Sequence, residues 1–260
     1  MSQDKDWDVA VGRDGFIGTV EMRRPPHNFI SVEIAGALAD ACEQLDADDG
    51  CRAIVLSTEG KSFCAGADLR GDAGEDGKAP TDVRTLYGHA VRLFSVKTPM
   101  IAAVQGAAIG AGLGLALVAD FRVVAPEARF AANFVKLGFH PGFGITHTLP
   151  RAVGEQRAAL MMLTGRRIKA EEALDWGLAD ALAPSGAMME AAKELAAEIA
   201  EAAPLAVKST RATLRAALAE AVRAKTEVER TEQEWLRRTE DFAEGVRAVN
   251  ERRAGDFKGK

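Results

Sequence analysis

The sequence has little that would tie the protein to a membrane, a nucleic acid or a metal ion. None of its apolar runs reaches the roughly 20 residues that span a bilayer. No basic tract stands out among 33 basic and 38 acidic residues, and a net charge of -5 does not favour nucleic acid as a partner. The four histidines lack metal-ligand spacing, so we predict no metal site.

Cysteine is scarce as well, which excludes a disulfide framework. Cys42, Cys51 and Cys64 form an odd set without CxxC spacing. Buried, reduced thiols are typical of cytosolic proteins. The acidic and polar start, MSQDKDWDV, does not resemble a secretory signal. We therefore expect a cytoplasmic location.

Three common motifs for nucleotides or nucleophiles are missing. The glycines of residues 110–114 (GAGLG) do not make a dinucleotide fingerprint, because Leu115 stands at the third glycine position. Residues 59–62 (EGKS) do not complete a phosphate loop, because Val55 replaces its first glycine. No GxSxG nucleophile elbow is present.

What the sequence does contain is a pair of apolar runs, each followed by a turn of small residues. Residues 53–56 (AIVL) and 100–104 (MIAAV) are typical of buried strands. The turns that follow are residues 61–70 (KSFCAGADLR) and the start of residues 105–120 (QGAAIGAGLGLALVAD), whose remainder predicts an apolar helix. Small residues let backbone approach a ligand, and a helix start offers free N–H groups and a positive dipole end. Two such turns facing one point would form an oxyanion hole with two donors.

The rest of the chain predicts one domain, with helices gathered towards its end. The length of 260 residues fits one large core. Ser31 is placed to cap a helix, another helix ends before Pro99, and residues 71–82 read as a mobile loop. From residue 186 onward the pattern is helical, with breaks at Pro204 and near Gly245.

The two turn segments resemble the enoyl-CoA hydratase/isomerase (crotonase) superfamily. The resemblance lies in FCAGADLR at residues 63–70 and GAAIGAGLGLALVAD at residues 106–120. It continues in LGFHPGFG at residues 137–144, LTGRRIKAEEALDWGLAD at 163–180 and EGVRAVNERRAGDFK at 244–258. It therefore covers nearly the whole chain.

The resemblance implies an α/β fold and an assembly. The fold would be a crotonase-type spiral of ββα units in residues 1–200, with a C-terminal helical region in residues 201–260. In the family such helices form a trimer, often doubled to a hexamer, and residues such as Phe257 and Lys258 help to close the CoA site. The residues expected at the trimer contacts are Leu214, Leu218, Val222, Trp235, Phe242, Val246 and Val249, which recur at helical spacing. The alternative is that they pack on the core of the same subunit.

The resemblance also implies an acyl-CoA thioester as the partner, with coenzyme A as part of the substrate and no tightly bound cofactor. The N–H groups of Ala67 and Ala111 would bind the thioester oxygen and stabilise an enolate. Arg70 would lie near the CoA phosphates, although a solvated surface role is equally open. The residues implied for CoA binding are Ala65, Gly66, Ala67, Asp68, Leu69, Arg70 and Lys258.

The chain departs from the family at the positions where hydration occurs. Hydratases carry two glutamates that hold and activate water, and their places fall here on Gly114 and Phe134. Neither residue can transfer a proton. Related dehalogenases and other carboxylate-dependent variants need groups that Gly114, Phe134 and Gly142 do not supply.

His140 is the candidate replacement base. It lies on a Gly/Pro loop that the family places beside the acyl pocket, and imidazole can accept a proton near neutral pH. The alternative is a loop histidine satisfied by backbone or solvent. His89, Thr146 and His147 are weaker candidates.

Three functions remain open. The first is an acyl-CoA enzyme of the lyase or isomerase class that uses the oxyanion hole for isomerisation, decarboxylation, hydrolysis or C–C cleavage. The second is an acyl-CoA-binding protein without catalysis. The third is a weak enoyl-CoA hydratase of fatty-acid metabolism.

Overall fold

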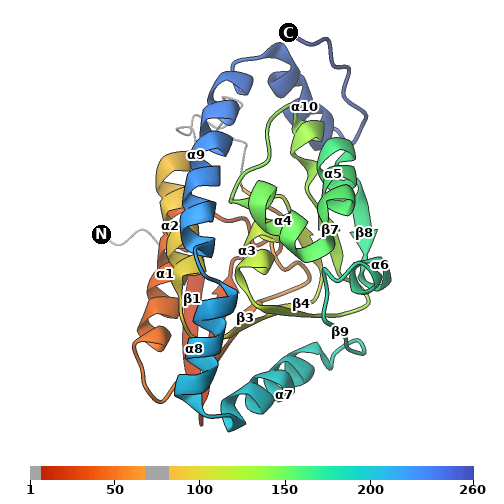
Figure 1. The fold of residues 1–260 in the computed structure, drawn as a ribbon. Helices are drawn as coiled ribbons and strands as arrows, with labels where there is room; N and C mark the ends of the chain where they lie inside the picture. The colour runs from red at the N-terminus through yellow and green to blue at the C-terminus, as the bar shows by residue number, and fades with distance from the viewer. Residues whose placement is uncertain (1–6, 68–81) are drawn as a thin grey trace, which may run out of the picture.

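Two β-sheets form the framework of the protein. The structure, a computed structural model, describes residues 7–67 and 82–260 (Figure 1). The larger sheet has six strands in the order β1 (Asp8–Asp14), β2 (Ile17–Arg23), β3 (Ala53–Thr58), β4 (Met100–Val104), β6 (Phe121–Val124) and β9 (Ala181–Leu182). Among the described strands of this larger sheet, only the β1–β2 pair is antiparallel. The smaller sheet contains β5 (Ala107–Ile109), β7 (Arg129–Ala131) and β8 (Arg167–Lys169).

Helices cover both faces of the larger sheet. The helices of the described residues are α1 (Val32–Asp46), α2 (Val83–Ser95), α3 (Ala111–Val118), α4 (Ile145–Val153), α5 (Glu155–Thr164), α6 (Ala170–Asp175), α7 (Met188–Glu201), α8 (Pro204–Leu214), α9 (Leu218–Leu236) and α10 (Glu240–Asn250). Among them α7 lies against β2, β3, β4 and β6, α1 against β1 and β2, and α9 and α10 pack on other helices. A 3₁₀ helix spans Asn133–Leu137. Along β3, Val55 packs towards α7 whereas Ile54 and Leu56 face the main core, because successive side chains of a strand point to opposite faces. This explains why the strand is apolar on both sides.

Several elements predicted from the sequence are confirmed. The runs at residues 53–56 and 100–104 are strands, and Ser31 caps α1 by accepting a hydrogen bond from the Ile34 N–H. Pro204 is the first residue of α8, a position where its missing N–H costs nothing. The mobile loop predicted for residues 71–82 lies, apart from Asp82, outside the described residues.

The break predicted near Gly245 is wrong, because Gly245 lies inside α10. A Cβ at this residue would stand 2.5 Å from the carbonyl carbon of Leu137. Glycine is therefore present so that α10 can pack closely against the 3₁₀ helix, and the chain instead turns before Thr239, which caps α10. A glycine within a helical pattern can mark a contact between backbones rather than an end.

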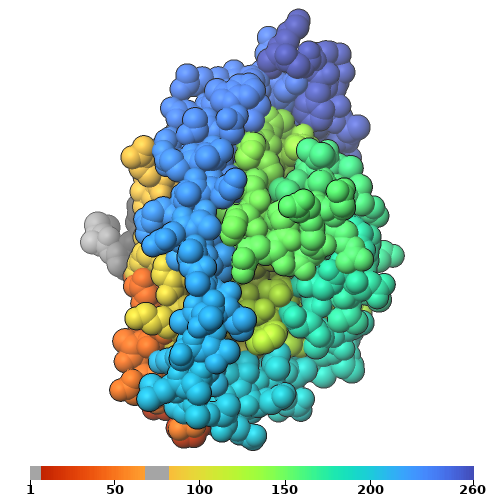
Figure 2. Space-filling model, in the orientation of Figure 1, coloured from red at the N-terminus to blue at the C-terminus, as the bar shows by residue number. Residues whose placement is uncertain are grey.

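The C-terminal helices pack on the rest of the chain. In the space-filling view the blue segment that contains α9 runs between the yellow-orange α2 and the green α4 and α5 (Figure 2). The apolar residues expected at subunit contacts divide into two groups. Leu218, Val222, Phe242 and Val246 are buried within this chain, whereas Leu214, Trp235 and Val249 are exposed. Packing within one subunit explains why Leu218, Val222, Phe242 and Val246 are apolar. A trimer contact stays a prediction for Leu214, Trp235 and Val249.

The remaining sequence expectations concern thiols and membranes. Cys42, Cys51 and Cys64 are buried and free, as predicted, and burial raises the pKa of Cys42 and of Cys64 to about 12. Such thiols stay protonated and unreactive. Within residues 7–67 and 82–260, no helix combines the length and the apolar character needed to cross a bilayer.

Candidate functional site

The two turns of small residues meet and hold each other. The Cys64 N–H donates to the carbonyl of Ala107 over 2.8 Å, and the Ile109 N–H donates to the carbonyl of Cys64 over 2.9 Å. The approach is closest at Gly112, where a Cβ would lie 2.0 Å from the Cys64 oxygen. Only glycine fits there. The close contact between the two turns therefore explains why the sequence has glycine at residue 112.

Ala67 and Ala111 lie where these turns open on a cavity of about 360 Å³. Ala111 is the first residue of α3, so its N–H has no acceptor within the helix. In the part of the chain that the structure describes, neither the Ala67 nor the Ala111 N–H donates a hydrogen bond. Every residue of α3 is buried, and the positive end of its dipole is therefore poorly screened by solvent. The structure thus places at one cavity the two residues that the sequence predicted as donors, and their donor role stays a prediction.

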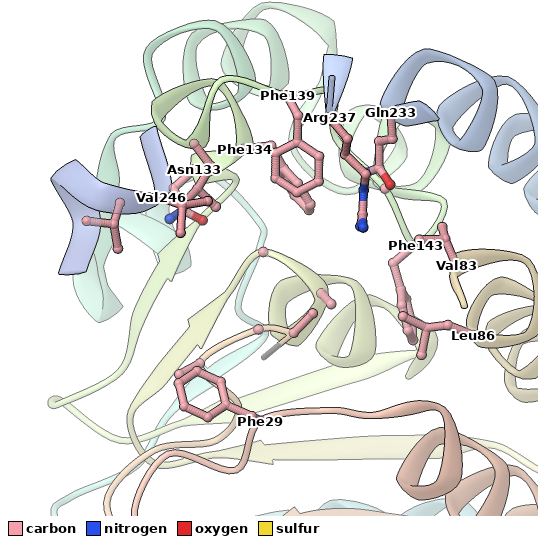
Figure 3. A pocket seen from close by; sticks show the side chains of 18 of the residues that line it. Phe29, Val83, Leu86, Asn133, Phe134, Phe139, Phe143, Gln233, Arg237 and Val246 are labelled. Atoms are coloured by element: carbon pink, nitrogen blue, oxygen red, sulfur yellow. The ribbon is translucent and has the colours of Figure 1, made fainter. Parts of the chain in front are cut away.

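Aromatic rings fill the positions at which the resemblance places the hydratase carboxylates. Phe134 lines the cavity, and its ring centroid lies 5.5 Å from that of Phe139 (Figure 3). A Cβ on Gly114 would stand 2.7 Å from the ring of Phe143. Phe143 is fully buried with a φ of 62°, a left-handed conformation that is uncommon for a bulky residue and that marks strain near sites. The space beside Gly114 is therefore occupied rather than empty.

A hydrogen-bonded chain closes the cavity beside Gly142. The Tyr87 hydroxyl donates to Oε1 of Gln233 over 2.9 Å, and Nε2 of Gln233 donates to the carbonyl of His140 over 2.7 Å. A Cβ on Gly142 would lie 1.8 Å from the Tyr87 oxygen, so that hydroxyl takes the place of a side chain. Burial raises the pKa of Tyr87, which therefore stays protonated and serves as a donor.

His140 does not direct its ring into this cavity. Its imidazole lines a neighbouring apolar cavity with Phe139 and Leu163, and its Nδ1 lies 2.8 Å from the carbonyl oxygen of Pro141. The histidine among the described residues of the first cavity is His27, which the sequence analysis did not single out. His27 is remote in sequence from both turns, and no motif marked it.

The predicted CoA-binding residues divide into three groups. Ala65, Gly66 and Ala67 line the cavity, whereas Asp68, Leu69 and Arg70 lie outside the described residues. Lys258 is exposed, and its Nζ contacts Oδ1 of Asp256 at 2.7 Å. Lys258 is absent from the described lining of the cavity.

A buried carboxylate ties α9 to the loop that carries Gly142 and Phe143. The carboxylate oxygens of Glu229 accept hydrogen bonds from the N–H of Gly144 at 2.7 Å, and from the N–H and hydroxyl of Thr146 at 3.0 and 2.6 Å. Burial raises the pKa of Glu229, and these hydrogen bonds act in the opposite direction. Glu229 caps α4 from another helix and so fixes one wall of the cavity.

Replacing Glu229 with alanine is expected to destabilise the fold by about 1–3 kcal/mol. The substitution leaves the buried N–H groups of Gly144 and Thr146 without an acceptor, which costs more than the lost bonds alone. Equilibrium unfolding in urea measures the change. Glu232→Ala, on the same helix but at a partly exposed position, is the matched control. Equal stability of Glu229→Ala and wild type would contradict the capping role.

Two helices outside the turns supply the polar residues that the sequence analysis missed. Tyr87 comes from α2 and lines the cavity. Gln233 comes from α9, Arg237 directly follows α9, and both line the same cavity (Figure 3). No local motif surrounds them, so a single sequence offers no signal for their convergence. Elsewhere in the described ranges, no group of three or more histidine, cysteine, aspartate or glutamate side chains is placed to hold a metal ion.

Known proteins resemble this chain over most of its length. Residues 12–260 match the sequence model of the enoyl-CoA hydratase/isomerase family. A 2,3-dehydroadipyl-CoA hydratase of Escherichia coli K12 is 34% identical over 255 residues, which cover 97% of this chain and 99% of that protein. A 1,2-epoxyphenylacetyl-CoA isomerase of the same strain is 33% identical over 249 residues, 93% of this chain and 95% of that one. The crystal structure of a carnitinyl-CoA hydratase from Mycobacterium avium superposes with a TM-score of 0.86 at 31% identity, covering 97% of this chain and 98% of the other.

Proposed function

Because the chain belongs to the enoyl-CoA hydratase/isomerase family, we propose that it binds an acyl-CoA thioester and stabilises the thioester enolate. The N–H groups of Ala67 and Ala111 would hold the oxygen. The observation that carries this proposal is that both residues open on one cavity, with Ala111 as the first residue of the buried helix α3. Donors fixed in a water-poor site act on developing charge without reorganisation. Coenzyme A would enter as part of the substrate, with no tightly bound cofactor.

The proposed reaction is one other than hydration by two glutamates. Among the described residues of the cavity there is no aspartate or glutamate. Isomerisation, decarboxylation, hydrolysis or C–C cleavage could draw a proton from another group or lose CO₂ from the substrate. His140 stays our proposed base, and this role requires its ring to turn from the neighbouring cavity towards the two amides.

A non-catalytic acyl-CoA-binding protein is the second candidate. It is favoured by the phenyl rings of Phe134 and Phe143 in the places where proton transfer would occur. Aromatic walls bind an acyl chain without changing it. A weak hydratase is the third candidate, and it would need groups other than carboxylates to position water.

A panel of thioesters separates these candidates when binding and turnover are measured independently. Crotonyl-CoA, a 3-enoyl-CoA, a malonyl-type CoA and a β-ketoacyl-CoA each test one reaction. Calorimetry gives affinity, and chromatography of the products gives turnover. Turnover of any member other than crotonyl-CoA supports the main proposal, whereas binding without turnover selects the second candidate. Absence of binding to every member would contradict both.

Arg70 is proposed to contact the CoA phosphates. Replacing Arg70 with alanine should weaken CoA binding and flatten its dependence on salt, because a contact between exposed charges is screened by ions. Titrations between about 0.05 and 0.5 M salt measure the slope, since the Debye length shortens markedly over such a range. Arg84→Ala, at an exposed position near the start of α2, is the control. If the substitution weakened a phosphate-free pantetheine thioester equally, the assignment would be wrong.

We further propose a homotrimer or a dimer of trimers in the cytoplasm. The exposed side chains of Leu214, Trp235 and Val249 in the C-terminal region 201–260 are the proposed contacts. Exposed apolar groups of this kind favour burial against another chain, and closed symmetry limits the assembly.

A further inference from the structure

We propose that the ring of Phe139 ends the acyl pocket, so that the protein takes short-chain acyl-CoA thioesters, and that a second apolar cavity behind this ring receives the tail of a longer chain once the ring is removed. This inference rests on the proposed function, because it names the length of acyl group that the same site admits. The observation that carries it is that Phe139 is the residue shared by the described linings of both cavities.

A thin segment of chain separates the two cavities. Successive residues of 133–143 face one cavity or the other. Those that line the first are Asn133, Phe134, Leu137, Gly142 and Phe143, and those that line the second are Val135, Gly138, His140 and Pro141. The end of α9 continues the division, with Gln233 on the first side and Leu236 on the second. The partition is therefore one layer of residues, and at Phe139 a single side chain borders both spaces.

A row of aromatic rings leads from the oxyanion amides to this partition. A Cβ on Gly110, the residue before Ala111, would lie 3.7 Å from Cζ of Phe134. The ring centroid of Phe134 is in turn 5.5 Å from that of Phe139 (Figure 3). An acyl chain that follows this apolar row from a thioester held at Ala111 therefore meets the ring of Phe139 within a short distance.

The ring of Phe139 is held on several sides. Its backbone N–H donates to the carbonyl of Phe134 over 3.2 Å. Phe242 meets the ring edge to face with centroids 5.2 Å apart, and the guanidinium carbon of Arg237 lies 5.7 Å from its centroid. Edge-to-face and cation–π contacts of this kind add to the gain from burial. Displacing the ring would break them, so it forms a fixed wall.

The second cavity suits an alkyl tail. Its volume is about 470 Å³, whereas that of the first is about 360 Å³. The polar side chains of its described lining are engaged: Nδ1 of His140 lies 2.8 Å from the carbonyl oxygen of Pro141, and the Thr146 hydroxyl donates to Glu229. Apolar side chains that complete the lining include Val135, Met162, Leu163 and Leu236. Methylene groups gain free energy on leaving water for such surroundings.

The test follows affinity against chain length. Butyryl-, octanoyl- and dodecanoyl-CoA are titrated by calorimetry, below the concentrations at which they form micelles, into wild type, Phe139→Ala and Phe242→Ala. Phe242 is the matched control, because it belongs to the same group of rings and is absent from the described linings of both cavities. Phe139→Leu, which also removes the ring, takes the place of the alanine variant if that protein does not fold.

We expect wild type and Phe242→Ala to bind octanoyl- and dodecanoyl-CoA no more tightly than butyryl-CoA. Phe139→Ala should bind octanoyl-CoA on the order of a hundredfold more tightly than butyryl-CoA, since each buried methylene is worth about fourfold in affinity. A steady rise of affinity with chain length in wild type, or no gain in Phe139→Ala, would overturn the inference while the acyl-CoA site stands. If wild type bound none of the three thioesters, the proposed function would fail and this inference with it.

A second substitution shows where the longer tail lies. Ala159 lines the second cavity from α5 and is absent from the described lining of the first. Adding Ala159→Phe to Phe139→Ala should abolish the affinity gained for octanoyl-CoA while butyryl-CoA still binds. A gain that persists in the double variant would place the tail elsewhere. A change in molar mass by light scattering for Ala159→Phe alone would assign the second cavity to a contact between copies of the chain, and either result would overturn its proposed role.

Discussion

Crotonyl-CoA is expected to bind this protein and to remain unhydrated at the rates of an ordinary hydratase. By family resemblance, hydration needs two carboxylates at the places of Gly114 and Phe134. General acid–base groups contribute about 10²- to 10⁴-fold each, so their joint loss removes several orders of magnitude. The decrease in absorbance of the conjugated thioester measures the reaction. Calorimetric binding of crotonyl-CoA is the control that separates slow chemistry from absent binding.

The same prediction can be tested in the opposite direction. Introducing glutamate at Gly114 and Phe134 together should not create a hydratase, because the ring of Phe143 would lie 2.7 Å from the new Cβ at residue 114. The added carboxylates would also be buried without partners, which is unfavourable. Hydration by the wild type at an ordinary rate would contradict the prediction that the missing carboxylates prevent it. Hydration by the double variant would contradict the conclusion that the Phe143 ring occupies the space beside residue 114.

Replacing Ala111 with proline is expected to lower turnover of the true substrate by about 10²- to 10³-fold, the usual effect of losing one oxyanion donor. A side-chain change cannot normally delete a backbone N–H. Here it can, because Ala111 is the first residue of α3 and proline is well tolerated at that position. The preceding residue, Gly110, has a φ of 55° and a ψ of -122°, a positive-φ conformation open to glycine, so it is not in the helical conformation that a following proline disfavours.

The readout for this variant does not depend on knowing the reaction. The infrared stretch of a ¹³C-labelled thioester carbonyl shifts to lower frequency when hydrogen bonds polarise it. We expect the shift in the bound ligand to shrink in Ala111→Pro and to persist in Ala111→Gly, which keeps the N–H. Affinity for free CoA, which has no carbonyl at this place, controls for general damage. An unchanged carbonyl shift in Ala111→Pro would remove Ala111 from the oxyanion hole.

The interior of the cavity could be foreseen only in part. The turns that carry Ala67 and Ala111 were predictable because glycine and alanine next to apolar strands have few structural explanations other than close approach. The role of Phe143 was not predictable from the sequence, because its left-handed backbone and its contact with Gly114 arise from loop packing. The placement of the His140 ring in the neighbouring cavity is a similar case, since it also depends on how the loop packs.

The sequence by itself determined the family, the two strands with their turns, and the absence of carboxylates at Gly114 and Phe134, because each of these is a property of residue type and local spacing. Only the tertiary structure decided what replaces those carboxylates. Gln233 and Arg237 reach the cavity from the end of α9, more than a hundred residues from the turns and from Tyr87 on α2. Contacts over such separations depend on how α2 and α9 pack together, and no local pattern encodes that packing.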